Sequence, residues 1–284
     1  MKSAGSAASQ AAVGARGEES SSPIRRHSVE LALAMDVAVR AGELLVDRLG
    51  RVETIRHKSP KDVVTEVDHL SEALILEAIR ATFPDDGILA EESGLAAGDN
   101  DRVWVVDPLD GTINYANGIP IFCVAIGLVV DGVPSVGVVR DPVRGETFAA
   151  TVDGPATLDG RAIAASTKEL MSDFVIALTI DGARLSERLE AIRDAIRVTR
   201  RLGSSALALA YVGAGRFDAF AQTHGLSAWD AAAAGLIAER AGATVSDAAG
   251  GQWFDLARGT RTFGVVAAPP AHHARLLDLV RTPD

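Results

Sequence analysis

The most informative stretch of the chain is VWVVDPLDGT, residues 103–112. Its first four residues are β-branched or aromatic, a pattern that is typical of a buried strand. We expect the two acids, Asp107 and Asp110, to leave the end of this strand together and to lie in a loop. Carboxylate oxygens and substrate phosphates are the usual ligands of Mg²⁺ in proteins. The stretch therefore predicts a site for metal-assisted phosphate chemistry.

On the N-terminal side of this stretch the apolar pattern is mainly helical. Residues 28–49 place their apolar side chains on one helical face and are followed by Gly50, which predicts an amphipathic helix. A loop is expected at residues 57–62. A second helix follows, capped by Thr65 or Asp68 and ending near residues 83–87. A short strand at 88–90 then leads into Glu91.

On the C-terminal side the pattern changes to strands. Residues 123–130, 133–140 and 146–151 are apolar and β-branched, and Asp131-Gly132 between the first two predicts a tight hairpin. Helices and strands alternate from residue 174 to residue 280, with a helix expected at residues 185–198, as in α/β proteins. We therefore expect a tail at 1–27, an N-terminal α+β part at 28–155 that carries the metal-binding loop, and a C-terminal α/β part at 156–284.

Composition and charge exclude several classes of protein. The chain has 284 residues and a net charge of −10, and it has no long run of Lys or Arg, so we expect no nucleic-acid partner. No apolar stretch is long enough to span a bilayer. Cys123 is the only cysteine, which excludes an intrachain disulfide and favours a cytoplasmic location. Residues 1–27 are rich in Ser, Ala and Gly and are expected to be disordered.

Three acidic motifs occur in a fixed order: EES at 91–93, DPLDGT at 107–112 and WD at 229–230, with VTEVD upstream at 64–68. Together they resemble the inositol monophosphatase family of Mg²⁺-dependent, lithium-sensitive phosphomonoesterases. The resemblance covers residues 28–280. It implies a layered αβαβα sandwich of the inositol monophosphatase and fructose-bisphosphatase type, which is both α+β and α/β in character. It also implies a homodimer.

The resemblance assigns a metal-binding role to each acid in these motifs. Glu91, Asp107 and the carbonyl of Leu109 would hold a first Mg²⁺ ion. Asp107, Asp110 and Asp230 would hold a second ion, so that Asp107 bridges the two. A third, weaker site near Glu91 would be completed largely by water, which gives two to three Mg²⁺ ions in all. Asp110 would also contact the substrate.

The resemblance also assigns catalytic and phosphate-binding roles. Thr112, hydrogen-bonded to Asp68, would orient and help to deprotonate the attacking water, with Glu91 as the third catalytic group. The amides of Gly111 and Thr112 would point at the phosphate.

Taken singly, the residues of these motifs have simpler explanations. Asp107 and Asp110 could shape a turn or cap a helix, and Asp230 could be the N-cap of its helix. Trp229 could pack in the core. We expect His272 and His273 to lie on the surface, because they lack the spacing of a zinc site.

The substrate is less well defined by the sequence. The small-residue turn Gly203, Ser204 and Ser205 matches a family turn beside the substrate ring. Many inositol monophosphatases carry an acid where this chain has Thr223, and a neutral hydroxyl accepts hydrogen bonds less strongly than a carboxylate. Gln222 and His224 are further candidates for this contact.

The sequence leaves three functions open. The first is hydrolysis of inositol-1-phosphate or a similar polyol phosphate, as a phosphoric monoester hydrolase. The second is the same chemistry on histidinol phosphate, fructose-1,6-bisphosphate or a 3′-phosphonucleotide. A second phosphate would require a basic pocket, for which Arg200 and Arg201 are the nearby pair. The third is a non-catalytic regulatory protein that retains the fold. In the first two cases the partner is a small phosphate monoester.

Overall fold

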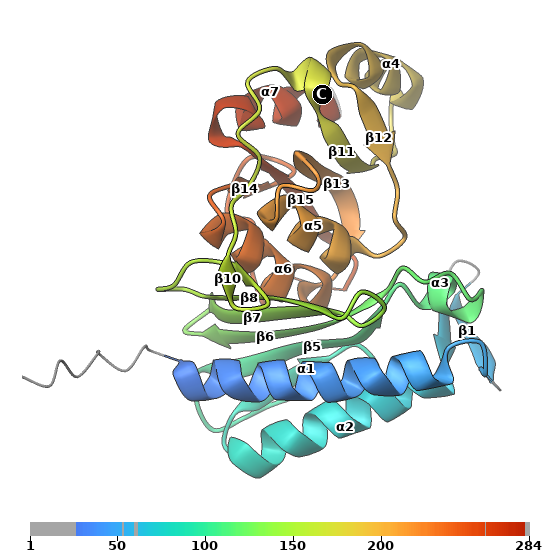
Figure 1. The fold of residues 1–284 in the computed structure, drawn as a ribbon, viewed down its shortest axis with the longest axis vertical. Helices are drawn as coiled ribbons and strands as arrows, with labels where there is room; N and C mark the ends of the chain where they lie inside the picture. Colours follow the sequence, from blue (N-terminus) through green and yellow to red (C-terminus); the bar gives the residue numbers. More distant parts are fainter. Residues whose placement is uncertain (1–26, 53, 60–61, 259, 282–284) are drawn as a thin grey trace, which may run out of the picture.

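The computed structural model describes residues 27–281 except 53, 60–61 and 259. The expected disordered tail at residues 1–27 lies outside this range, apart from His27. Helices and sheets alternate in layers, in the order helix, sheet, helix, sheet, helix (Figure 1). This is the predicted αβαβα sandwich, and the prediction of the fold is confirmed.

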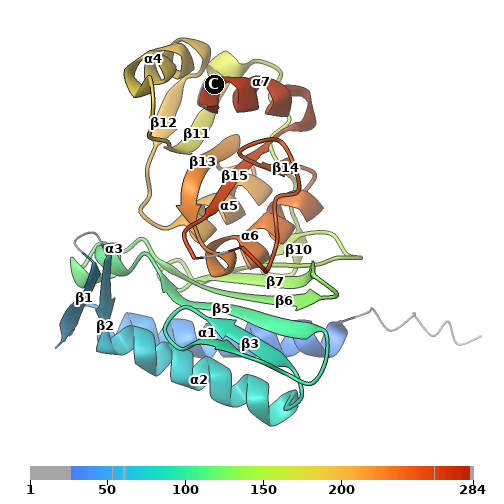
Figure 2. The same cartoon turned by 180° about the vertical axis from the view of Figure 1, so that it is seen from behind.

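The first two layers form the N-terminal half of the molecule. Helices α1 (Ser28–Arg48) and α2 (Glu66–Thr82) cover the outer face of an eight-stranded sheet (Figures 1 and 2). Their apolar stripes pack on this face in one core that includes Leu45, Ile75 and Trp104. The strands of this sheet are β3 (Gly87–Ala90), β4 (Gly94–Ala96), β5 (Arg102–Asp110), β6 (Cys123–Val130), β7 (Val133–Asp141), β8 (Glu146–Thr151), β9 (Thr157–Leu158) and β10 (Arg161–Ala162).

The eight-stranded sheet has the order β10-β9-β8-β7-β6-β5-β3-β4. Its neighbouring strands are antiparallel except β3 and β5, which are parallel. The predicted hairpin joins β6 to β7, and both Asp131 (φ 51°) and Gly132 (φ 78°) adopt the left-handed conformation that a tight two-residue turn requires. Strands β9 and β10 extend this sheet to Ala162, beyond the boundary expected after residue 155.

The remaining three layers form the C-terminal half. Helices α5 (Ser205–Gly213) and α6 (Ala228–Arg240) lie between the two sheets, and their many alanines allow close packing on both sides. Helices α4 (Leu185–Ala195) and α7 (Pro270–Val280) cover the outer face of the second sheet (Figure 2). This five-stranded sheet has the order β12-β11-β13-β15-β14, from Val198–Arg200, Val175–Thr179, Ala219–Leu226, Phe263–Ala268 and Thr244–Asp247.

Three local expectations were wrong. Residues 57–59 and 62 of the expected loop lie in the antiparallel strands β1 (Ile55–Ser59) and β2 (Asp62–Thr65), because residues 63–65 pair with residues 55–57. Residues 60 and 61 of that loop lie outside the described residues. The helix expected at 185–198 ends at residue 195, and residue 198 begins strand β12. His273, expected on the surface, is buried, and its Nε2 lies 3.0 Å from Ser246 Oγ.

Two short helices complete the described chain: α3 (Thr112–Ala116), directly after β5, and a 3₁₀ turn at Met171–Asp173. None of the helices in the described ranges combines the length and the apolar character that crossing a membrane requires.

Candidate active site

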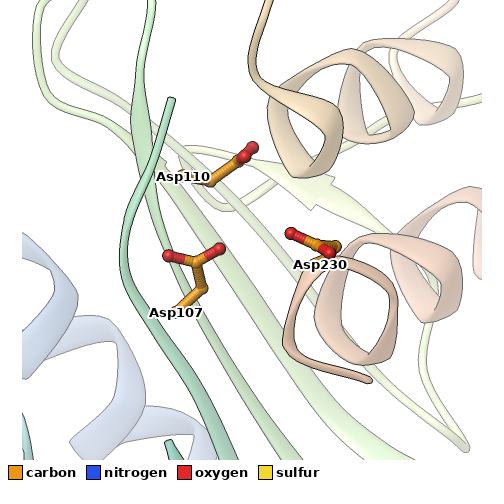
Figure 3. Close-up of side chains that lie close together, drawn as sticks. All are labelled: Asp107, Asp110 and Asp230. Atoms are coloured by element: carbon orange, nitrogen blue, oxygen red, sulfur yellow. The ribbon is translucent and has the colours of Figure 1, made fainter. Parts of the chain in front are cut away.

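The two acids of the DPLDGT motif lie within strand β5 rather than in a loop after it. Pairing of β5 with β6 shifts register between Asp107 and Asp110, so the strand carries an irregularity there. Residues three apart on a regular strand face opposite sides of the sheet, and this irregularity lets both carboxylates face α6 (Figure 3). Asp107 Oδ1 accepts a 3.0 Å hydrogen bond from the Leu109 amide, which fixes the turn of the motif.

A third acid reaches the same place from α6. Ser227 is the N-cap of this helix, and Asp230, at the third helical position, accepts a 2.6 Å hydrogen bond from the Ser227 amide. Asp230 therefore belongs to a capping box and is not itself the N-cap. Its carboxylate points toward those of Asp107 and Asp110 (Figure 3), and oxygens of the three side chains all lie within 4.8 Å of one another.

Glu91 stands beside this cluster because β3 and β5 are parallel neighbours. The register pairs Ala90 with Val106, and the Glu91 amide donates a 3.1 Å hydrogen bond to the Val106 carbonyl. Glu91 and Asp107 are thus the next residues along adjacent strands. Strand β3 ends at Ala90, whereas β5 continues to Asp110, so Glu91 leaves the end of β3 beside Asp107.

The electrostatics of the cluster call for a cation. Burial raises the pKa of Asp107 well above its usual range, and the charges of Glu91, Asp110 and Asp230 raise it further. Burial and the charge of Asp110 likewise raise the pKa of Asp230. Closely spaced buried carboxylates repel one another unless a positive charge neutralises them. A set of hard oxygen donors in this arrangement fits divalent ions such as Mg²⁺.

Thr112 and Asp68 form the predicted pair next to the cluster. Thr112 Oγ1 lies 3.0 Å from Asp68 Oδ1 and also 3.0 Å from the carbonyl oxygen of Leu109. A hydroxyl has one proton, so it donates to one of these acceptors at a time. Asp68 is only 1% exposed, and its Oδ2 accepts hydrogen bonds from the amide (2.8 Å) and the hydroxyl (2.6 Å) of Thr65. Asp68 is therefore held in one orientation.

Gly111 brings the chain close to the second half of the molecule. Its φ of +99° is one that side chains rarely adopt, and an added Cβ would lie 3.0 Å from the Ile121 carbonyl oxygen. Asn114 fastens the same region, because its Nδ2 donates 2.8 Å hydrogen bonds to the carbonyls of Ile121 and Leu202. The amides of Gly111 and Thr112 thus belong to a tightly held turn.

The small-residue turn before α5 contacts the cluster directly. Asp110 Oδ2 accepts a hydrogen bond of 2.6 Å from Ser204 Oγ and one of 2.7 Å from the Ala206 amide. Burial raises the pKa of Asp110, and these bonds oppose the rise. The Asp110 carboxylate of the first sheet therefore accepts hydrogen bonds from the start of α5, which belongs to the second half.

A cavity of about 730 Å³ opens over these groups. It is bordered by Glu91, Asp107, Leu109, Asp110, Gly111, Thr112, Gly203, Ser204, Ser205 and Asp230. Two predicted residues lie elsewhere among the described parts of the chain: Asp68 stands behind Thr112, and Thr223 is not part of the lining. Gln222 borders the cavity instead, and its Oε1 accepts a 3.1 Å hydrogen bond from Ser205 Oγ. His224 is exposed and pairs with Asp181 at 2.7 Å.

Several residues that support the site were missed from the sequence. Glu72 Oε2 accepts a 2.9 Å hydrogen bond from the Glu92 amide, and Ser71 Oγ donates one of 2.8 Å to the Pro108 carbonyl. Both side chains are buried on the core-facing side of α2. Two polar residues in the apolar stripe of an amphipathic helix are the signal that could have identified them, because buried polar groups require partners.

The chain resembles known proteins over nearly its whole folded length. A model of the inositol monophosphatase family matches residues 27–283. The Nus factor SuhB of Pseudomonas aeruginosa is 38% identical over 79% of this chain and 87% of its own. The fructose-1,6-bisphosphatase/inositol-1-monophosphatase of Thermotoga maritima is 37% identical over 74% of this chain and 82% of its own.

Two solved structures also resemble this chain over most of its length. The extragenic suppressor protein SuhB of Bartonella henselae superposes with a TM-score of 0.84 at 31% identity, covering 90% of this chain and 100% of that one. The IMPase of Thermotoga maritima superposes with a TM-score of 0.80 at 32% identity, over 89% and 96% of the two chains.

Proposed function

Because this chain belongs to the inositol monophosphatase family, we propose that it is a Mg²⁺-dependent phosphomonoesterase that hydrolyses inositol-1-phosphate or a similar polyol phosphate. The observation that carries the proposal is the convergence of Asp107, Asp110 and Asp230, with oxygens within 4.8 Å, beside the Thr112–Asp68 pair. Isolated acids on a surface would not need this degree of burial and mutual support.

The metal ions would be held by Glu91, Asp107 and the Leu109 carbonyl, and by Asp107, Asp110 and Asp230. When bound, divalent ions neutralise phosphate oxygens, acidify water and stabilise a departing alkoxide. The rest of the catalysis comes from residues of the chain, which position the substrate and the water and place charges around the phosphate.

Thr112 is the residue that orients the nucleophilic water. With its proton donated to the fixed carboxylate of Asp68, its hydroxyl oxygen keeps lone pairs that accept a hydrogen bond from water. Asp68 thereby sets the direction of the Thr112 hydroxyl and favours proton transfer away from the water. The amides of Gly111 and Thr112, at the turn into α3, would bind phosphate oxygens.

The polar lining beyond the acids suits the hydroxyls of a leaving alcohol. The hydrogen-bonded pair Ser205 and Gln222 presents donors and acceptors without charge. Thr223, which we expected here from the sequence, is replaced in this role by its neighbour Gln222.

The test is a phosphate-release assay on the purified protein, with and without Mg²⁺. Its substrates are inositol-1-phosphate, histidinol phosphate, fructose-1,6-bisphosphate and 3′-phosphoadenosine 5′-phosphate. We expect Mg²⁺-dependent release that millimolar lithium inhibits and that Asp107→Asn abolishes. Absence of release from every ester in the presence of Mg²⁺ would refute the proposal.

A second candidate is a non-catalytic regulatory role on the same fold. It is favoured by one observation: the relative from Pseudomonas aeruginosa is named a Nus factor, a name that states no hydrolytic activity. The two candidates separate in the same assay, because a purely regulatory protein would release no phosphate while still binding Mg²⁺.

A further inference from the structure

A second hollow, here called the apolar compartment, adjoins the cavity of the candidate active site. It has a volume of about 390 Å³, and pockets that hold small ligands measure about 300–1,000 Å³. Four of its residues also border the active-site cavity, so the two spaces lie side by side: Leu89, Leu95, Trp229 and Thr260. The other described residues of its lining are Ala228, Leu256, Ala257 and Arg258.

Three segments that are distant in the sequence build the walls of the apolar compartment. Leu89 of β3 and Leu95 of β4 are direct partners in the antiparallel pairing of these strands, so their side chains share one face. Trp229 lies in the first turn of α6, directly before Asp230. Leu256 lies in the loop between β14 and β15. The apolar walls therefore begin one residue away from a proposed metal ligand.

The apolar compartment carries little charge, in contrast to the acid cluster beside it. Among the described residues of its lining, only Arg258 is charged, and its guanidinium pairs with Asp247 at 3.1 Å. Leu89, Trp229 and Leu256 are partly buried and pack against the core between the two sheets. An ion that moves into such a space loses hydration, whereas an apolar group gains free energy by leaving water. The lining therefore favours an uncharged, apolar occupant.

The surroundings of the apolar compartment favour a small molecule over a protein as this occupant. Leu95 is 67% exposed, and none of the other strongly exposed large apolar side chains in the described ranges borders the apolar compartment. The hollow is thus not the centre of a broad apolar face. A stable contact between proteins buries about 800 Å² on each partner, which is far more surface than one exposed leucine and the hollow beside it provide.

We propose that the apolar compartment binds an uncharged apolar group of the leaving alcohol, such as an aromatic ring, so that the preferred substrates are phosphate monoesters of amphiphilic alcohols. The indole of Trp229, at the border of both spaces, can pack against such a ring. The inference rests on the proposed function and narrows its substrate class. An alcohol that carries hydroxyls alone would gain nothing from this compartment.

The experiment compares two esters that differ only in an aromatic ring, 3-phenylpropyl phosphate and propyl phosphate. The ring is remote from the ester oxygen, so the two alcohols are similar as leaving groups. For both esters kcat/KM is measured with Mg²⁺ at low and at high ionic strength. We expect the phenyl ester to be preferred about tenfold or more, chiefly through KM, because the ring is buried in the bound substrate and in the transition state alike. The preference should persist at high salt, which screens charges but not apolar contacts.

The affinities of the matching phosphonates provide a readout that does not require turnover. 3-Phenylpropylphosphonate and propylphosphonate contain a P–C bond in place of the ester bond that water cleaves. Isothermal titration calorimetry with Mg²⁺ measures the Kd of each. We expect the ring to tighten binding about tenfold and to make the heat-capacity change of binding more negative, which is the signature of apolar burial.

Two variants at exposed positions test the location of the ring. Leu95→Asn replaces an apolar wall with an amide, and Ala257→Trp adds a large side chain to the lining. Both should lower kcat/KM and phosphonate affinity about fivefold more, or further, for the phenyl member than for the propyl member. Leu170→Asn is the matched control, because Leu170 is 62% exposed and borders neither space. It should leave the ratio between the two members unchanged.

The outcomes separate the apolar compartment from the proposed function. Equal kcat/KM for the two esters, or an equal loss for both members in the two variants, would overturn the role of the compartment and leave the phosphatase intact. Sedimentation of the wild type and of Leu95→Asn tests a second copy as the occupant, and loss of a dimer in the variant would overturn the inference. No turnover of any ester would overturn the proposed function. A ring-dependent phosphonate affinity that Leu95→Asn abolishes would then still support the compartment as a binding site.

Discussion

Ser204 Oγ donates a 2.6 Å hydrogen bond to Asp110 Oδ2, and this contact joins the two halves of the molecule at the centre of the site. Asp110 lies at the end of β5 in the first sheet, and Ser204 is the N-cap residue of α5. The Ala206 amide donates a second hydrogen bond to the same oxygen, so Oδ2 is held from the second half of the molecule. The serine therefore fixes the orientation of a carboxylate that we propose as a metal ligand.

Ser204→Ala is expected to weaken Mg²⁺ activation. Loss of a hydrogen bond to a buried carboxylate costs about 1.5–3 kcal/mol, so the Mg²⁺ concentration for half-maximal activity should rise about tenfold or more. Activity at saturating Mg²⁺ should fall much less. Titration of activity with Mg²⁺ measures both.

Ser205→Ala is the control, because its hydroxyl bonds to Gln222 and not to Asp110. Ser204→Thr should restore the metal response by returning a hydroxyl. If both alanine variants shift the Mg²⁺ dependence equally, the positioning role of Ser204 is wrong.

Asp107→Asn is expected to lower kcat by at least ~10³, even at saturating Mg²⁺. Asp107 is 1% exposed and lies between Glu91, Asp110 and Asp230, so a neutral amide removes the shared charge that the cations require. Loss of other electrostatic stabilisers in enzymes has effects of this size. Steady-state kinetics and circular dichroism on the same sample check the result, and near-normal turnover would refute the metal-bridging assignment.

Stability without metal is expected to decrease as pH rises. The folded-state pKa values of Asp107 and Asp230 lie above the ordinary value, so at intermediate pH the folded protein binds more protons than the unfolded chain. The free energy of unfolding then falls with pH, from about pH 4 up to the raised folded-state pKa values. Because metal binds the ionised carboxylates, the stabilisation by Mg²⁺ should grow over the same interval.

Urea unfolding at several pH values, in chelator and in Mg²⁺, measures this effect. Asp230→Asn should flatten the decline in chelator, because it removes one of the responsible groups. Curves with and without Mg²⁺ that stay parallel across the whole range would contradict the prediction.

Thr112→Val is expected to lower kcat about 10²-fold or more, which is the usual range for loss of an acid–base contribution. Valine keeps the shape of the side chain and removes the hydroxyl that faces Asp68 Oδ1 at 3.0 Å. Thr112→Ser keeps the hydroxyl and should retain most of the activity. Rates measured at saturating substrate and Mg²⁺ separate the two variants, and similar losses in both would argue for packing rather than water orientation.

Asp86→Ala tests stability far from the site. Asp86 accepts hydrogen bonds of 2.9 Å from Trp104 Nε1 and from Arg102 Nε, and Trp104 is fully buried. Burial alone would raise the pKa of Asp86, but the hydrogen bonds from Arg102, Asn100 and Trp104 hold it below the usual value. The stabilisation is present above the unfolded-state pKa and is lost as pH falls through the lower folded-state pKa.

The variant should lose about 2–4 kcal/mol in the free energy of unfolding at neutral pH, because it strands a buried indole N–H and removes one of the two carboxylates that pair with Arg102, the other being Glu30. Asp85→Ala, at the exposed neighbouring position, is the control. Equal midpoints of urea unfolding for the two variants would contradict the prediction.

Much of the fold follows from patterns that are local in the sequence. The stripe in residues 28–49, the Asp131-Gly132 turn and the strand before Asp107 each predict their element by periodicity or by turn chemistry. Short strands were missed because pairing partners, not local pattern, decide them: β1 and β12 exist because β2 and β11 lie alongside. His273 is buried because β15 and Ser246 of β14 lie opposite its helix.

The acids of the site were predictable because they cluster in short motifs, whereas their geometry was not. The register shift that turns Asp107 and Asp110 to one side depends on pairing with β6. Gln222, and not Thr223, borders the cavity, and this depends on where β13 meets the turn at Ser205. Contacts between distant segments are hard to predict from the sequence. The contact of Glu72 with the Glu92 amide is indicated only by a polar residue within the apolar stripe of a helix.

The walls of the cavity come from two sheets, and this has an evolutionary consequence. The first sheet carries most of the groups expected to handle phosphate, while residues 200–205 and 222 of the second half line the part of the cavity where we expect the leaving alcohol. Mutations in the latter segments can change substrate preference while the hydrolytic machinery is inherited intact. A protein that descends from this one could therefore act on a new substrate after changes in only these two short segments.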